Sequence, residues 1–162
     1  MLIDLWHELV TDPAFDLNLV IVGAPGWRVK DVIARLEASP LYGKRIFWLR
    51  NISDAGLSWL YENCQALLYP SLYEGWGLPV VEALQHKRPT IISSCGAVPE
   101  AGMGVATIID PADRDGWRDA IVRIAGEPRT TLDFNIKLPT WDLATENVKR
   151  VILSLPAIGA VA

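Results

Sequence analysis

The stretch QALLYPSLYEGWGLPVVEAL, from Gln65 to Leu84, contains the unit that decides the fold of this chain of 162 residues. Its apolar run from Ala66 to Tyr69 is stopped by a proline, which predicts a short buried strand. A glycine-containing loop follows, and Pro79 then suits the first turn of a helix that runs to about His86. The stretch therefore predicts a strand, a turn and a helix in immediate succession, which is the repeating unit of α/β proteins.

The same alternation of strand and helix continues on both sides of this stretch. Further strands are predicted for residues 17–23, 45–49, 89–93 and 106–110, and helices for residues 2–10, 28–38, 54–63, 113–126 and 141–155. The strands are apolar on both faces, which is typical of a parallel sheet covered by helices on each side. We therefore predict an α/β fold, a Rossmann-like doubly wound parallel sheet, with the domain spanning 1–155 and an apolar C-terminal tail at 156–162.

Composition narrows the class of protein. The net charge is −4 and the chain has no long basic run, so we expect no nucleic-acid partner. No apolar stretch is long enough for a membrane span, and charged residues interrupt the N-terminus where a signal peptide would be apolar. Cys64 and Cys95 form no CxxC pair, which fits thiols in a reducing compartment. We expect a cytoplasmic protein, with peripheral attachment at the inner membrane surface as the alternative.

The loop between the strand at 66–69 and the following helix is the first candidate site, because ligands of open parallel sheets bind at the carboxyl ends of the strands. Gly75 and Gly77 are expected to allow positive φ and close approach of a ligand. The free N–H groups at the start of the helix form an anion site, commonly used for phosphate. Glu74 lies just before the turn, and Glu82 is expected in the first turn of the helix. The loop GAPGW, from Gly23 to Trp27, is the second candidate at the same edge.

An anion site between two carboxylates suits a ligand that has phosphate in the middle and hydroxyl-bearing rings on both sides. Carboxylates accept strong hydrogen bonds from sugar hydroxyls, so a sugar nucleotide has the required layout. A purely structural interpretation stays open, because a glutamate in the first turn of a helix is favourable for the helix dipole alone. Glu74 could equally be an ordinary acidic residue of a loop.

The segment PSLYEGWGLPVVEAL resembles the acidic motif of the retaining glycosyltransferases of family 4, also called group 1, which have the GT-B fold. The motif is E-x7-E with an aromatic–Gly–Leu–Pro centre, and Glu74 and Glu82 match its two acids. LVIVGAPGW, RPTIISSCGAVPEAG, ATIIDPADRDGWRDAI and TWDLATENVKRVI also resemble segments of the family's C-terminal, donor-binding domain. The resemblance covers most of the chain from Leu2 to Ile152.

The resemblance implies a donor site and a role for each of its residues. Glu74 would be the catalytic position and would contact hydroxyls of the donor sugar, and Glu82 would bind the ribose. Backbone groups near the glycine turn would meet the sugar and diphosphate, and the loops after the first two strands would accept the nucleotide and border its base. The residues so implied are Gly23, Ile52, Glu74, Gly75, Trp76, Gly77, Leu78 and Glu82. The resemblance implies no metal and no cofactor apart from the nucleoside diphosphate sugar, which is the donor substrate.

The implied function is the donor-binding domain of a retaining hexosyltransferase that transfers a sugar from a nucleoside diphosphate to an acceptor hydroxyl. The expected setting is polysaccharide or glycolipid synthesis, with a sugar or lipid-linked acceptor and with mannose from GDP-mannose as the donor. One alternative is a non-catalytic nucleotide-binding or interaction module. A dinucleotide-binding oxidoreductase is a further alternative, but no GxGxxG follows any predicted strand.

The chain also departs from the family pattern. A strand followed by an arginine and a lysine precedes the family's first helix of this domain, and this chain has no match for them. It has no match for the N-terminal domain either, so we expect the isolated chain to be inactive without that domain. In a doubly wound sheet the first strand is central, which predicts a gap between the strands at Val20 and Leu68. We expect the gap to close by direct pairing, to be filled by another segment such as the apolar tail from Val151 to Ala162, or to be filled by strand exchange in a homo-oligomer.

Two single-residue departures concern positions where the family usually has glycine. This chain has Lys87 at the end of the motif helix and Arg50 after the strand at 45–49. Arg50 is expected to narrow or recharge the pocket for the base, so the sequence leaves the identity of the base open.

Overall fold

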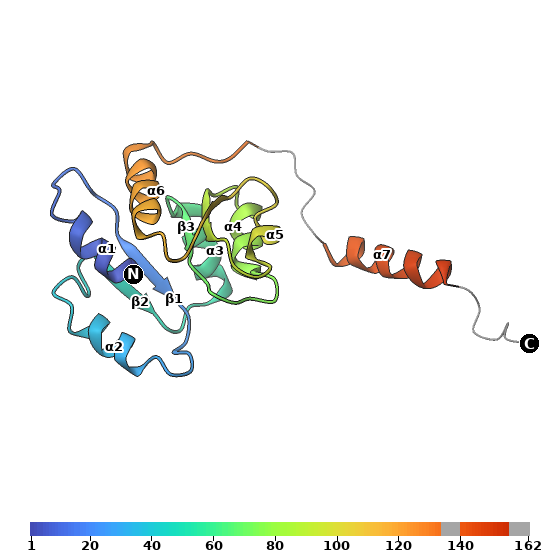
Figure 1. Cartoon of the computed structure of the whole chain (residues 1–162), viewed down its shortest axis with the longest axis horizontal. Coiled ribbons are helices and arrows are strands. Elements are labelled where there is room, and N and C mark those ends of the chain that lie inside the picture. The colour runs from blue at the N-terminus through green and yellow to red at the C-terminus, as the bar shows by residue number, and fades with distance from the viewer. Residues whose placement is uncertain (134–139, 156–162) are drawn as a thin grey trace, which may run out of the picture.

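A computed structural model describes residues 1–133 and 140–155, and it confirms the predicted alternation of strands and helices (Figure 1). The strands are β1 (Leu19–Val22), β2 (Ile46–Leu49), β3 (Leu67–Tyr69), β4 (Thr90–Ser93) and β5 (Thr107–Ile109). The helices are α1 (Leu2–Leu9), α2 (Lys30–Glu37), α3 (Asp54–Asn63), α4 (Leu78–Gln85), α5 (Val98–Ala101), α6 (Arg114–Gly126) and α7 (Trp141–Ser154). The short helix α5 was not predicted, because its four residues are too few to show a helical period.

Side-chain caps explain where several helices begin. The Ser53 hydroxyl accepts a hydrogen bond from the backbone N–H of Gly56 at 3.2 Å, so α3 begins where the sequence predicts. Thr140 caps α7 in the same way, and the Asp113 carboxylate caps α6. Each cap satisfies one of the N–H groups that a helix end leaves free, which fixes the entry of the chain into the helix.

The strands are all parallel but form two sheets rather than one. β1 pairs with β2 in a two-stranded sheet, and the other three strands form a sheet of order β3-β4-β5. The expected closure of the gap by direct pairing of the strands at Val20 and Leu68 is therefore wrong. No described strand fills the gap either. Strand exchange with a second copy stays a prediction, since the structure contains one chain.

A shared core joins the two sheets, whose strands do not pair with each other. The side chains of α1, α2 and α6 form one apolar cluster, in which Trp6 and Trp117 are almost completely buried. Ile21 of β1 and Leu68 of β3 both pack against this cluster. The core therefore packs against strands of both sheets.

The second core lies on the opposite face and belongs to the three-stranded sheet alone. Val80, Val81 and Leu84 of α4 are packed there with Val98 and Ala101 of α5, and Ile92 supplies the sheet side of the cluster. The helices on both faces and the parallel strands together match the predicted doubly wound class. This second core fixes α4, and with it the start of the acidic motif, against the ends of β3 and β4.

The chain after α6 returns past the residues that precede β4, at the amino-terminal ends of the strands in the three-stranded sheet. The backbone N–H of Leu132 donates to the Lys87 carbonyl at 2.8 Å, and the Arg88 guanidinium donates to the Thr130 carbonyl at 3.3 Å. α7 then has no buried residue and is drawn away from the body in Figure 1. Since residues 151–154 belong to this helix, the expectation that they fill the gap as a strand is wrong. The proposed tail at 156–162 lies outside the described residues.

None of the helices in the described ranges is both long and apolar enough to cross a membrane. Cys64 and Cys95 are free thiols and only half-buried, so the apolar sequence around them overstated their burial. Burial raises the pKa of the Cys64 thiol, which keeps it in the protonated, less reactive form.

Candidate functional site

The loop from Pro70 to Gly77 joins the end of β3 to the start of α4, at the carboxyl edge of the three-stranded sheet. Gly77 takes φ 97°, a left-handed conformation that glycine adopts at low cost. A Cβ at this position would also lie 3.4 Å from the Ala101 Cβ, so α5 approaches the turn closely. Gly75 does not take a positive φ, so the prediction that both glycines do so is wrong for Gly75. A Cβ added at Gly75 would instead meet no other atom within 4 Å, so this position has room beside it.

The backbone at the start of α4 has the properties of an anion site. Gly77 is the N-cap, and its carbonyl already accepts a hydrogen bond from the Val80 N–H at 3.0 Å. Among the described residues, no group accepts a hydrogen bond from the backbone N–H of Trp76, Gly77 or Leu78. Pro79 has no N–H, so three successive donors precede it at the positive end of the helix dipole.

Glu82 lies just beyond the first turn of α4, where the sequence analysis expects it inside that turn. The helix begins at Leu78, which makes Glu82 its fifth residue, and its first turn contains no acid. The structural alternative, a glutamate placed only to suit the helix dipole, therefore loses its support, because the dipole effect falls off within the first turn.

The carboxylate of Glu74 is held by two hydroxyl groups. The Tyr69 hydroxyl donates to Oε1 of Glu74 at 2.7 Å, and the Ser71 hydroxyl donates to the same oxygen at 2.9 Å. The buried Ser93 hydroxyl in turn donates to the Ser71 carbonyl, which ties this loop to the end of β4. A Cβ at Gly96 would lie 3.4 Å from the Glu74 carbonyl oxygen, so the next loop also packs against Glu74. Within the described ranges, no group forms a hydrogen bond to Oε2 of Glu74.

The carboxylate of Glu82 is held in a similar way from a different helix. The Tyr61 hydroxyl of α3 donates to Oε2 of Glu82 at 2.9 Å. The Tyr61 ring stacks on His86, with ring centroids 5.5 Å apart, and His86 lies 3.8 Å from the Glu62 carboxylate. Both acids of the motif thus have one oxygen anchored by a tyrosine, which fixes their orientation and leaves the second oxygen available.

Burial and these carboxylates also set the protonation of the tyrosines. Burial raises the pKa of Tyr69, and the hydrogen bond to Glu74 raises it further. Burial and the hydrogen bond to Glu82 likewise raise the pKa of Tyr61, and the charge of a nearby Tyr69 phenolate would add to this shift. Both tyrosines therefore stay protonated and act as hydrogen-bond donors.

The other predicted site residues are divided between the two sheets. Gly23 follows β1, takes φ 128° and has open space around its Cα, and its carbonyl accepts a hydrogen bond from the Trp48 indole at 2.9 Å. Ile52 follows β2 and is half-buried. Both follow strands of the two-stranded sheet, whereas the residues from Glu74 to Glu82 follow β3 of the three-stranded sheet. The predicted site therefore lies across the gap between the sheets.

Trp76 and Leu78 lie within the motif, but their side chains are placed differently. Trp76 is half-buried and packs against the core of α4 and α5, so its ring has a packing role in addition to the free backbone N–H. Leu78 is 64% exposed and points away from that core. Arg50, expected to recharge the base pocket, stacks over Trp48 at 3.9 Å and pairs with Glu37 at 2.6 Å.

The sequence analysis missed the residues that hold the two acids. Tyr69 and Ser71 precede Glu74 by a few positions, so a tyrosine at a strand end beside an acidic loop was an available signal. Tyr61 is 21 positions from Glu82 and Ser93 is 22 from Ser71, and nothing in the sequence connects either pair. These contacts follow from the packing of α3 on α4 and of β3 beside β4.

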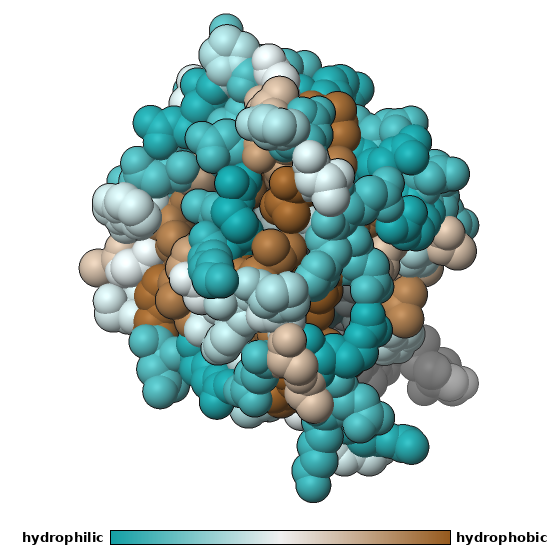
Figure 2. Space-filling view, turned by 90° about the vertical axis from the view of Figure 1, so that its left-hand side faces the viewer, coloured by the Kyte–Doolittle hydropathy of each residue, from teal (hydrophilic) through white to brown (hydrophobic). Residues whose placement is uncertain are grey.

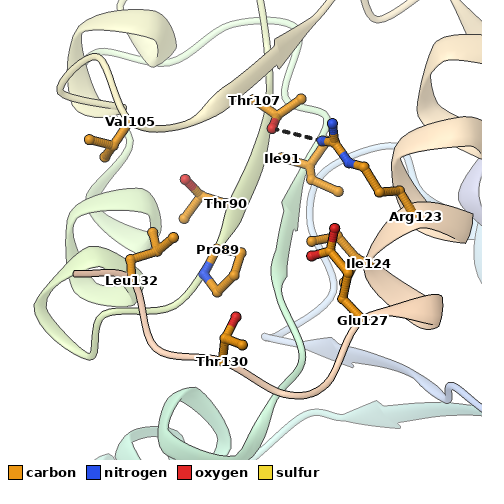
Figure 3. Close-up of a pocket in the computed structure, with 10 residues that line it drawn as sticks. All are labelled: Pro89, Thr90, Ile91, Val105, Thr107, Arg123, Ile124, Glu127, Thr130 and Leu132. Carbon is orange, nitrogen blue, oxygen red and sulfur yellow. Dashed lines mark hydrogen bonds between the residues drawn. The ribbon is translucent and has the colours of Figure 1, made fainter. Parts of the chain in front are cut away.

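A small cavity of about 200 Å³ lies at the opposite edge of the three-stranded sheet, where β4 and β5 begin (Figure 3). The buried Thr90 hydroxyl lines it and has no hydrogen-bond partner among the residues that the structure describes, and Arg123 reaches across to the Thr107 hydroxyl at 3.4 Å. Because parallel sheets bind ligands at their carboxyl ends, this cavity is not the candidate site. Within the described ranges, no three histidine, cysteine or acidic side chains are grouped closely enough to hold a metal ion.

Comparisons with known proteins agree with the fold and the motif. The family described as "Glycosyl transferases group 1" matches residues 1–127. The serotype-specific mannosyltransferase WbdA of Escherichia coli is 36% identical over 98% of this chain, which spans 19% of that protein. The O-antigen chain mannosyltransferase RfbU of Salmonella typhimurium is 31% identical over 67% of the chain, which spans 30% of it.

A solved structure confirms the fold class independently of these sequences. The crystal structure of TarM superposes on 76% of this chain and 24% of its own, with a TM-score of 0.61 and 18% sequence identity. At that identity the likeness establishes the fold alone. In each of these comparisons, the matched part of the chain covers less than a third of the length of the relative.

Proposed function

Since the chain belongs to the glycosyl transferases of group 1, we propose that it is the donor-binding domain of a retaining hexosyltransferase. The reaction would transfer a sugar from a nucleoside diphosphate to an acceptor hydroxyl. The observation that carries this proposal is the pair of glutamates beside the free N–H groups at the start of α4. Each glutamate has one oxygen anchored by a tyrosine hydroxyl and one available for a ligand.

The proposed chemistry is electrostatic. The free oxygen of Glu74 would accept hydrogen bonds from hydroxyls of the donor sugar, and its charge would stabilise positive charge as it develops on the reacting ring. The N–H groups of Gly77 and Leu78 would donate to the diphosphate as it leaves. Glu82 would accept hydrogen bonds from the ribose hydroxyls. Gly23 and Ile52 would line the nucleotide end of the site from the other sheet.

Mannose from GDP-mannose is the proposed donor. Support comes from WbdA and RfbU, both of which are named as mannosyltransferases. The proposed acceptor is a sugar or lipid-linked sugar in the synthesis of a surface polysaccharide or glycolipid. We further propose that the activity requires an N-terminal domain to bind this acceptor, so the chain alone would bind the donor without transferring its sugar.

Isothermal titration calorimetry with GDP-mannose, GDP, UDP and ADP tests the proposal directly. We expect GDP and GDP-mannose to bind, and the variant Glu82→Gln to bind both at least about tenfold more weakly, because a charge-assisted hydrogen bond is worth roughly 1.5–3 kcal/mol. Glu146→Gln, an exposed glutamate of α7, is the matched control and should bind like the unmodified chain.

Two results would contradict the assignment. Equal binding by Glu82→Gln and the unmodified chain would remove Glu82 from the site. Tight binding of UDP or ADP in place of GDP would overturn the donor but keep the donor-binding role.

A non-catalytic nucleotide-binding or interaction module is the second candidate, and one observation favours it. None of the proposed site residues, Gly23, Ile52, residues 74–78 and Glu82, is a lysine or an arginine. A leaving diphosphate is normally neutralised by such cations. This candidate predicts nucleotide binding without sugar transfer even when an acceptor-binding domain is added.

A further inference from the structure

The C-terminal end of α4 is held in a fixed conformation by two backbone hydrogen bonds. The N–H of Lys87 donates to the Leu84 carbonyl at 2.9 Å, and the N–H of Arg88 donates to the Ala83 carbonyl at 2.9 Å. These two bonds are the pair that closes a Schellman motif, with His86 as the C-cap. The backbone of His86 is therefore fixed relative to the rest of α4.

His86 lies next to Glu82 on the surface of α4. The two residues are four positions apart, which places their side chains side by side on one face of a helix. Tyr61 of α3 contacts both of them. Its ring stacks on the His86 imidazole, with an angle of 19° between the ring planes, and its hydroxyl donates to Oε2 of Glu82. One side chain of α3 therefore connects the histidine with the glutamate.

The Tyr61 ring is well covered in this contact. It is 8% exposed, whereas Figure 2 shows apolar residues at the surface, between hydrophilic margins, on the side of the molecule that carries the two-stranded sheet. His86 is half-buried, and its imidazole lies against one face of the phenol ring. Stacked aromatic rings at this separation attract each other beyond the effect of the area that they bury. The imidazole therefore restricts where the phenol ring, and with it the hydroxyl, can lie.

Glu62, the residue after Tyr61, is held from the same end of α4. Its carbonyl accepts a hydrogen bond from the guanidinium of the buried Arg88 at 2.5 Å, and its carboxylate lies 3.8 Å from Nδ1 of His86. His86 and Arg88 thus both contact the last turn of α3. The position of Tyr61 is therefore set by residues at the end of α4 as well as by its own hydrogen bond to Glu82.

We infer that His86 is a positioning residue for Glu82 and acts through Tyr61. This inference rests on the proposed function, in which Glu82 accepts hydrogen bonds from the ribose hydroxyls. The imidazole holds the phenol ring so that its hydroxyl stays on Oε2 of Glu82, and the carboxylate then binds the ribose with little loss of rotamer freedom. His86 itself does not touch the nucleotide.

Calorimetric titration of the full chain with GDP, or with UDP or ADP if the chain prefers it, tests the inference. His86→Ala removes the stacked ring, so we expect the nucleotide to bind roughly three- to tenfold more weakly, the range that corresponds to the energy of an aromatic pair. His86→Phe keeps a flat ring at the same place and should bind within about twofold of the unmodified chain. Gln85→Ala changes an exposed residue of the same turn and is the matched control, which should bind like the unmodified chain.

A second ligand separates an effect on Glu82 from a general loosening of the helix. The dideoxy form of the same nucleotide lacks both ribose hydroxyls, so Glu82 has no proposed partner on it. We expect His86→Ala and the unmodified chain to bind this form equally. Tyr61→Phe removes the hydroxyl and keeps the ring. In that background His86→Ala should weaken binding of the ordinary nucleotide by less than about twofold, because coupled side chains give non-additive effects.

Two binding results would overturn the inference. One is equal binding of the nucleotide by His86→Ala and the unmodified chain. The other is equal weakening of the nucleotide and its dideoxy form by His86→Ala, since the histidine would then only support the fold.

Urea unfolding of the free chain decides the inference if the unmodified chain binds no nucleotide, a result that would reject the proposed function. His86→Ala and Glu82→Gln should then have non-additive effects on the free energy of unfolding, because Tyr61 contacts both side chains. Additive effects would overturn the inference as well.

Discussion

In each glutamate of the acidic motif, one carboxylate oxygen accepts a hydrogen bond from a tyrosine hydroxyl. Tyr69 and Ser71 both donate to the same oxygen of Glu74, whereas Tyr61 alone donates to Glu82. A carboxylate on a flexible side chain would lose rotamer freedom on binding a sugar, and these hydroxyls fix it beforehand. We infer that the tyrosines act as positioning residues for the proposed ligand contacts.

The variant Tyr69→Phe tests this inference at Glu74. It removes one hydroxyl from a partly buried carboxylate, so we expect GDP-mannose to bind about fivefold more weakly, from roughly 1 kcal/mol for a lost hydrogen bond. The affinity for GDP should hardly change, because Glu74 is proposed to contact only the sugar. Calorimetric titration of both ligands measures the difference.

Tyr73→Phe is the control for that experiment, because Tyr73 is 87% exposed and makes no side-chain hydrogen bond to Glu74. If Tyr69→Phe weakened GDP and GDP-mannose equally, the tyrosine would be supporting the loop as a whole and not orienting Glu74.

At the scale of single elements, the end of α4 contains an unusual conformation. Lys87 takes φ 55°, just beyond the C-cap His86, and its N–H donates to the Leu84 carbonyl at 2.9 Å. This left-handed position is the one that glycine occupies most often after a helix, and a side chain there is strained. The family's preference for glycine at this place, noted from the sequence, thus has a local conformational cause.

Lys87→Gly should therefore stabilise the protein. We expect the free energy of unfolding to rise by roughly 0.5–1 kcal/mol, since relief of the left-handed strain exceeds the entropy that glycine adds to the unfolded chain. Urea unfolding followed by tryptophan fluorescence measures it. The control is Gln85→Gly, inside the helix, which should lower the free energy of unfolding by about the same amount. If Lys87→Gly also lowered the free energy of unfolding, the Lys87 side chain would make a contact that outweighs the strain.

For the molecule as a whole, the tyrosine–glutamate pairs predict a limit to stability at high pH. The pKa values of Tyr61 and Tyr69 are raised by burial and by their glutamates, whereas in the unfolded chain both ionise near the ordinary tyrosine pKa of about 10. Above that pH the unfolded state binds fewer protons than the folded state, so stability must fall as the pH rises further.

Unfolding by urea at several pH values measures this effect. A range of about pH 8 to 11 is suitable, because tyrosine in the unfolded chain ionises within it. We expect stability to decline as the pH rises above about 10 and the decline to be shallower in the double variant Tyr61→Phe, Tyr69→Phe. Identical slopes for the two proteins would show that other groups account for the whole alkaline loss.

The sequence predicted those features that short-range patterns encode. Apolar runs closed by Pro70 or by Gly23 mark strand ends, and Ser53 and Thr140 cap helices as expected, because both kinds of signal act within a few residues. Glu82 was expected in the first turn, because a helix counted from Pro79 makes it the fourth residue, whereas the helix that begins at Leu78 makes it the fifth. The Tyr61–Glu82 contact depends on how two helices pack, which no local pattern contains.

The two sheets are joined by side chains and not by a ladder. Between residues 1–52 and 64–133 of the described chain there is no backbone–backbone hydrogen bond. Glu8 of α1 reaches Arg114 of α6 at 2.6 Å, and the two tryptophans of the shared core lie beneath. A shear displacement of one half along the other would thus disturb packing and the two exposed ion pairs of Glu8, with Arg114 and Arg118, while leaving each ladder intact. The spacing between Gly23 on one half and Glu74 on the other is consequently set by side-chain packing and not by a ladder of backbone hydrogen bonds.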